Sequence, residues 1–104
     1  MNADFLKQEF LSKYLSMGPD KFYRSLLSYC IKKIVSAKQE KKEHLTINLE
    51  LLDYHDQLII LYRREGDINS LEVAKLFRKA AHRIYRFLLK EKLTNKSDKF
   101  LNLV

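Results

Sequence analysis

Glycine and proline are so rare in this chain that they limit the folds open to it. Gly18, Pro19 and Gly66 are the only residues of these two types among 104. An all-β fold needs a turn about every eight to twelve residues, and turns depend heavily on glycine and proline. The sequence therefore predicts an all-α fold, with one helix ending at Gly18 and another at Gly66.

Apolar residues recur at helical spacing along the amino-terminal half of the chain. Between Asp4 and Met17 they are Leu6, Phe10, Leu11, Tyr14 and Leu15. Gly18 ends this helix and Pro19 opens the next one, because a missing N–H costs nothing in a first helical turn. We expect the second helix to run to about Lys42, with an apolar stripe of Phe22, Tyr23, Leu26, Leu27, Cys30, Ile34 and Ala37.

Residues 45–64 fit two different structures. Apolar and polar residues alternate strictly over residues 45–51, and residues 58–62 have high strand propensity, a combination typical of a β-hairpin. The same residues also fit a helix that Asn48 caps and Gly66 ends, with acidic residues in its first turn. We favour the helix and keep the hairpin as the alternative.

Residues 70–92 form the clearest amphipathic pattern of the chain. At about 100° per residue, one side is apolar and an arc of roughly 140° on the other side is cationic. The residues of this basic face are Lys75, Arg78, Lys79, His82, Arg83, Arg86 and Lys90. Asn69, followed three residues later by Glu72, predicts a capped start. Leu89 interrupts the arc, and Tyr85 at its flank is a candidate for stacking on nucleic-acid bases.

Two known motifs resemble parts of this region. One part of this region resembles a helical hairpin of a tetratricopeptide repeat. The residues that carry the resemblance are Tyr62, Arg63, Arg64, Glu65, Gly66, Asp67, Ala74, Phe77 and Ala81. A helix-turn-helix is similar at Val73, Ala74, Phe77, Ile84 and Phe87. The repeat occurs once, whereas a solenoid needs about three. Arg78 and Lys79 replace the turn glycine and buried apolar residue of the helix-turn-helix, so we predict one continuous helix and carry over no functional residues.

Charge is unevenly distributed along the chain, whose net charge is +7. Residues 74–92 hold seven Lys and Arg against one Glu, whereas residues 43–67 hold six Asp and Glu against two Arg. The acidic segment can lie beside the basic helix and partly neutralise it, as consecutive elements often do. The excess positive charge would then face solvent, phosphate or an acidic protein surface.

Residues that carry chemistry are sparse. His44, His55 and His82 are scattered and lack the spacing of metal ligands, and Cys30 stands alone in an apolar stripe. Two isolated glycines cannot form a phosphate-binding loop. We therefore predict no catalytic residue, metal site or cofactor, and expect neither an enzyme nor a small-molecule substrate.

The sequence predicts an antiparallel four-helix bundle, with a single helical domain over residues 1–93 and a tail over residues 94–104 that ends in apolar residues. The lone cysteine and the lack of a long apolar run favour the cytoplasm and no membrane span. The favoured function is a non-enzymatic protein-interaction module that forms a homodimer or binds an acidic partner protein. The alternative is a nucleic-acid-binding protein that uses the basic face.

Overall fold

The computed structural model describes the backbone of residues 3–36 and 42–95 and the side chains of residues 3–35 and 46–90. In chain order its helices are α1 (Ala3–Leu6), η1 (Lys7–Leu11), α2 (Ser12–Met17), α3 (Pro19–Ser36), α4 (Lys42–Glu65) and α5 (Ile68–Asn95). The segments α1, η1 and α2 follow one another without a break, so they form one helix, called here the first helix. The predicted all-α bundle is confirmed.

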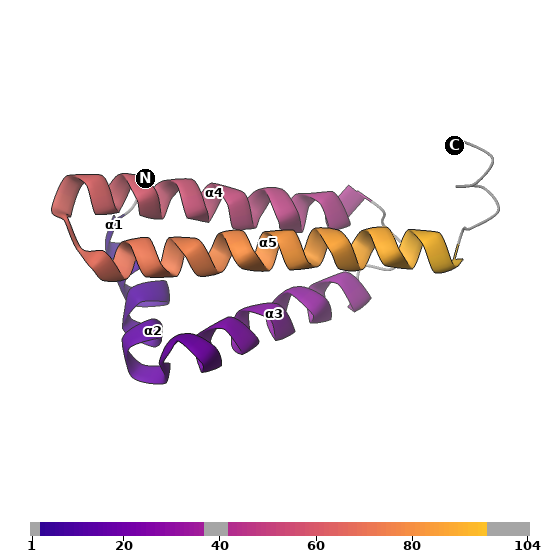
Figure 1. Ribbon diagram of the computed structural model, residues 1–104, viewed down its shortest axis with the longest axis horizontal. Coiled ribbons are helices and arrows are strands. Elements are labelled where there is room, and N and C mark those ends of the chain that lie inside the picture. The colour runs from indigo at the N-terminus through magenta and orange to yellow at the C-terminus, as the bar shows by residue number, and fades with distance from the viewer. Residues whose placement is uncertain (1–2, 37–41, 96–104) are drawn as a thin grey trace.

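The α4 and α5 helices pack against each other as an antiparallel pair (Figure 1). Gly66 ends α4 at a φ of 71°, and its N–H donates to the Tyr62 carbonyl at 2.7 Å. Ala74 and Ala81 are buried on α5, and such small side chains let two helix axes approach closely. The α3 helix runs in the same direction as α5 at an angle to it, and the first helix crosses the bundle near the turn between α4 and α5 (Figure 1).

Residues 45–64 lie within α4, so the helix that we favoured is confirmed and the hairpin does not form. Burial explains why the alternation was misleading. Ile47 and Leu51, four residues apart, are buried, whereas Leu49 between them is 66% exposed. Residues four apart share a face of a helix, and residues two apart do not. The helix also begins at Lys42 rather than at the predicted cap, Asn48.

Phe77 of α5 lies at the centre of the core and is 1% exposed. Its ring contacts one ring from each of the other helices. The distances between ring centroids are 4.8 Å to Phe10 of the first helix, 6.2 Å to Phe22 of α3 and 5.7 Å to Tyr54 of α4. Aromatic pairs at such separations add roughly 0.5 to 1.5 kcal/mol each to the stabilisation from burial. This side chain therefore joins all four helical segments.

A π-helical turn, η1, brings two leucines of the first helix onto the core face. Leu6 and Leu11 are five residues apart and both buried. On a regular α-helix they would lie about 140° apart. In a π-helix the hydrogen bonds run from residue i to residue i+5, so such residues lie nearly above one another. The wider turn brings Leu6 and Leu11, both members of the predicted apolar set, onto the same side of the first helix.

The amino end of α5 differs from the prediction. Asn69 lies inside the helix, and Asp67 is the capping residue, because its Oδ1 accepts the Asn69 N–H at 2.9 Å. The Asp67 carbonyl also accepts the Ser70 N–H at 3.0 Å. At the other end α5 continues to Asn95, past the predicted domain boundary at residue 93. The rest of the predicted tail, residues 96–104, lies outside the described residues.

Replacement of Asp67 by Ala should lower the free energy of unfolding by about 1 kcal/mol, because the Asn69 N–H in the first turn of α5 loses its side-chain acceptor. The same replacement at Asn69 should cost less than about 0.5 kcal/mol, since its side chain caps nothing among the described residues. Urea denaturation of both variants measures the difference. A larger loss for Asn69→Ala than for Asp67→Ala would restore the original assignment of the cap.

Candidate functional site

The residues of the predicted basic face lie together on one helix. The α5 helix continues through Arg78 and Lys79 without a break, so the turn of a helix-turn-helix is absent there. All seven predicted residues are exposed, namely Lys75, Arg78, Lys79, His82, Arg83, Arg86 and Lys90. The opposite side buries Val73, Ala74, Phe77, Ala80, Ala81 and Ile84. The core therefore fixes the rotation of α5 and turns the basic face outward.

The arginines of this face have no acidic partner among the side chains of residues 3–35 and 46–90. Among the described residues, Arg78, Arg83 and Arg86 form no ion pair with an acidic side chain. The Lys75 ammonium lies 3.7 Å from Glu72 Oε1, and the Lys79 ammonium lies 4.6 Å from the centre of the Tyr23 ring. Within the described part of the chain, no carboxylate competes with a binding partner for these three guanidinium groups.

The acidic residues of α4 are directed elsewhere. Glu65 accepts a hydrogen bond from the Lys7 ammonium at 2.8 Å, and this bond raises the pKa of Lys7. Glu50 Oε2 lies 3.7 Å from the Lys33 ammonium of α3. Although α4 lies beside α5 as expected, these two carboxylates neutralise the first helix and α3. The charge of the basic face is therefore not cancelled by them.

Further acidic groups on α4 bond within that helix. Asp53 accepts a hydrogen bond from the Gln57 amide at 2.7 Å, and Asp56 Oδ1 lies 2.9 Å from His55 Nδ1. No group of three or more His, Cys, Asp or Glu side chains within the described parts of the chain could hold a metal ion. None of the described helices is both long enough and apolar enough to cross a membrane.

Exposed apolar side chains flank the basic face on the second half of α5. Tyr85 is 53% exposed, Leu89 is 39% exposed and Phe87 is 37% exposed. The exposure of Tyr85 and Leu89 agrees with their predicted positions. Phe87 falls on the apolar side of the helix at 100° per residue, which predicts burial, but the structure leaves it partly exposed. The face therefore combines guanidinium groups with large apolar side chains.

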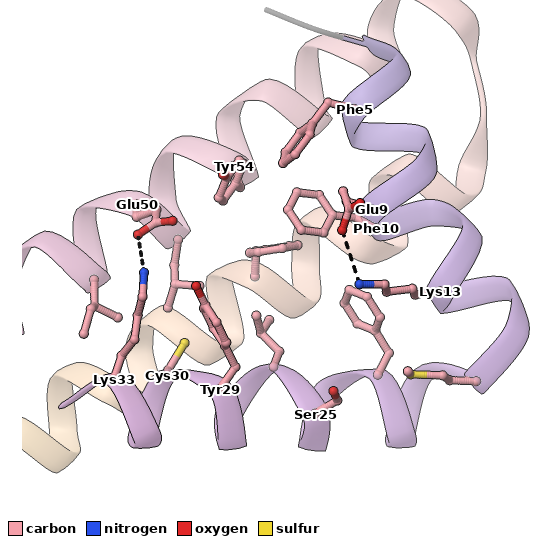
Figure 2. Close-up of a pocket in the computed structure, with 16 residues that line it drawn as sticks. Phe5, Glu9, Phe10, Lys13, Ser25, Tyr29, Cys30, Lys33, Glu50 and Tyr54 are labelled. Atoms are coloured by element: carbon pink, nitrogen blue, oxygen red, sulfur yellow. Dashed lines mark hydrogen bonds and ion pairs between the residues drawn. The ribbon is translucent and has the colours of Figure 1, made fainter. Parts of the chain in front are cut away.

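Sequence reasoning missed a cavity of about 330 Å³ between the first helix, α3 and α4. Figure 2 shows its lining residues, which come from these three elements and, through Phe77, from α5. They are Phe5, Glu9, Phe10, Lys13, Met17, Phe22, Ser25, Leu26, Tyr29, Cys30, Lys33, Ile47, Glu50, Leu51, Tyr54 and Phe77. Phe10, Phe22, Leu26 and Cys30 belong to the predicted core stripes, so nothing in the sequence distinguishes their role as cavity wall from packed interior.

No protein-family model, curated protein or solved structure matches this chain. The function must therefore be inferred from the molecule itself, that is, from the basic face of α5 and the cavity.

The Cys30 thiol in the cavity wall should react slowly. Burial raises the pKa of Cys30 to about 11, so very little of the reactive thiolate is present near pH 8. At pH 8.5 we expect alkylation by iodoacetamide to be at least about tenfold slower in the folded protein than in urea. Mass spectrometry of timed samples measures both rates, and equal rates would show that the thiol is accessible and ionised.

Proposed function

We propose that this protein is a non-enzymatic interaction module that binds an acidic partner protein through the basic face of α5. One observation carries the proposal. Arg78, Arg83 and Arg86 project from one continuous helix without an acidic partner among the described residues, beside exposed Tyr85 and Leu89. Arginine and tyrosine are enriched among residues that dominate the binding energy of protein interfaces.

The exposed apolar side chains favour a protein partner over nucleic acid. Burying apolar area contributes roughly 25 cal/mol per Å², and a partner protein can supply an apolar surface opposite Leu89 and Phe87. A phosphate backbone supplies only charge and hydrogen-bond acceptors at such positions. A protein that presents carboxylates around an apolar patch would therefore satisfy both components of this face.

Self-association is a second form of the same proposal. Several large apolar side chains are exposed on a chain of only 104 residues, among them Leu15, Leu49 and Ile60. Small domains bury a limited share of their surface alone, and symmetric dimers are the commonest oligomers. The homodimer and the cytoplasmic location stay predictions from the sequence, and the buried lone Cys30 is compatible with a reducing compartment.

Nucleic-acid binding remains the second candidate, and the geometry of α5 is the observation that favours it. The cationic side chains share one face of a helix that extends without interruption from Ile68 to Asn95. A helix of this kind can follow a groove or a backbone and neutralise several phosphates. Half-exposed Tyr85 beside Arg86 would then be placed to stack on an unpaired base.

The double variant Arg83→Glu with Arg86→Glu should lose the partner protein. Reversed charges on the face would repel carboxylates, and recovery of specific partners from nuclease-treated lysate should fall at least about tenfold, equivalent to about 1.4 kcal/mol. Quantitative mass spectrometry after affinity capture measures the loss. The matched control, Arg24→Glu with Arg63→Glu, changes the net charge equally at exposed sites on α3 and α4 and should retain the partners.

The apolar component is tested by Leu89→Ser, with Leu52→Ser on α4 as its matched control, because both side chains are 39% exposed. Both leucines are exposed, so neither change should unfold the protein. Loss of partners with Leu89→Ser alone would support a protein interface. Partners that survive both the charge reversal and Leu89→Ser would show that the binding surface lies elsewhere.

For the second candidate, fluorescence titration with duplex and single-stranded oligonucleotides over a range of salt concentrations is decisive. Binding through this face requires log affinity to fall linearly with log salt, with a slope of about −0.9 for each duplex phosphate neutralised. The Arg83→Glu, Arg86→Glu variant should abolish that binding, whereas Leu89→Ser should leave it unchanged. Affinity that is insensitive to the charge reversal would exclude the basic face as a nucleic-acid site.

A further inference from the structure

The floor of the cavity is apolar and rich in aromatic rings. Phe22, Cys30, Leu51 and Phe77 in its wall are buried. Phe10 packs edge-on against Tyr54, with ring centroids 4.9 Å apart. Edge-to-face pairs of this kind present both ring faces and ring edges to whatever lies against them. The wall therefore favours a molecule that is itself apolar and contains an aromatic ring.

The charged residues at the rim neutralise each other. The Lys13 ammonium lies 3.3 Å from Glu9 Oε2 on the first helix, and the Lys33 ammonium lies 3.7 Å from Glu50 Oε2 between α3 and α4. Figure 2 shows these two pairs on different sides of the cavity. With two lysines and two glutamates, the rim has no net charge. The rim can form hydrogen bonds with a ligand, but each of its charged side chains is already paired with one of opposite charge.

The titratable groups deeper in the cavity stay uncharged. Burial raises the pKa of the Cys30 thiol to about 11 and also raises the pKa of the Tyr54 hydroxyl. Both groups are therefore neutral near pH 7. A charged ligand would lose its hydration inside this cavity without gaining a net counter-charge, which disfavours its binding. A neutral ligand avoids that cost.

The volume of the cavity is unusual for a packed interior. Protein cores contain few voids larger than a water molecule, whereas ligand sites occupy roughly 300 to 1,000 Å³. At about 330 Å³, this cavity falls at the lower end of that range. The first helix, which contributes part of the wall, crosses the bundle instead of running alongside α3 and α4 (Figure 1). Phe5, Met17 and Tyr29 line the cavity and are exposed, so the cavity opens to solvent beside them.

We propose that this cavity, walled by the first helix, α3 and α4 and closed at its base by Phe77, binds a neutral aromatic small molecule. Its aromatic wall, balanced rim and size define the chemistry of the ligand. The site lies on the core side of α5, away from the basic face, so the proposal is independent of the function proposed above.

The test uses N-phenyl-1-naphthylamine, a neutral aromatic dye that becomes fluorescent in apolar surroundings. Ser25 is exposed and lines the cavity, so Ser25→Phe places an extra ring in it without altering the buried core. We expect one dye to bind each chain, and Ser25→Phe to weaken binding at least about tenfold. The matched control is Ser28→Phe, at an exposed position of α3 outside the cavity, which should change the affinity less than about twofold.

The sulfonated analogue of the same dye, 8-anilinonaphthalene-1-sulfonate, tests the requirement for neutrality. Its binding should be at least about tenfold weaker at the cavity, and any signal from the basic surface should be unaffected by Ser25→Phe. Circular dichroism confirms that both variants fold, and amide chemical shifts of wild-type protein should move at Cys30 and Tyr54 on dye addition.

Three results would overturn the proposal. Dye affinity that is equal in wild type and Ser25→Phe would place the dye elsewhere on the protein. Chemical shifts that move only on α5 residues of the basic face would do the same. Dye binding that weakens as protein concentration rises would show that a side chain of a second copy, and not a small molecule, is the occupant of the cavity.

Discussion

The burial of Phe77 is the constraint on which the rest of the structure depends. Its ring contacts aromatic side chains from the first helix, α3 and α4, so it holds together segments from the whole described chain. Burying it also determines the rotation of α5 about its own axis. On a helix, Lys75 and Arg86 lie roughly 160° to 180° from Phe77, so they must point outward when Phe77 points inward. The basic face is therefore a consequence of the core.

The same helix separates the two candidate sites. Phe77 forms the base of the cavity on the core side of α5, and the guanidinium groups lie on the solvent side. A ligand in the cavity and a partner on the basic face would not compete for the same atoms. The first helix is the element that distinguishes this arrangement from a regular bundle, because it contains a π-helical turn and crosses the other helices instead of running alongside them.

The distribution of ion pairs explains why the net positive charge stays at the surface of α5. Glu50 and Glu65 of α4 lie near lysines of α3 and the first helix. Exposed pairs of this kind contribute about 0 to 1 kcal/mol each, so they stabilise the fold little. They pair Glu50 and Glu65 with lysines of α3 and the first helix, although the order of segments alone predicts that these carboxylates would pair with α5. Pairing depends on which helix faces lie opposite each other, and that is decided by packing.

The sequence alone was sufficient to predict the all-α class, the helix ends at Gly18 and Gly66, and the amphipathic pattern of α5. These features depend on local backbone geometry and on the spacing of apolar residues, which can be seen in the sequence. Only the tertiary structure decided the exposure of Phe87, the cap at Asp67, the π-helical turn and the cavity. Each of these depends on how far a neighbouring helix reaches or how the chain enters a turn. A stripe of apolar residues predicts that one face of a helix will be buried. The angle between that helix and its neighbours decides how completely the face is buried.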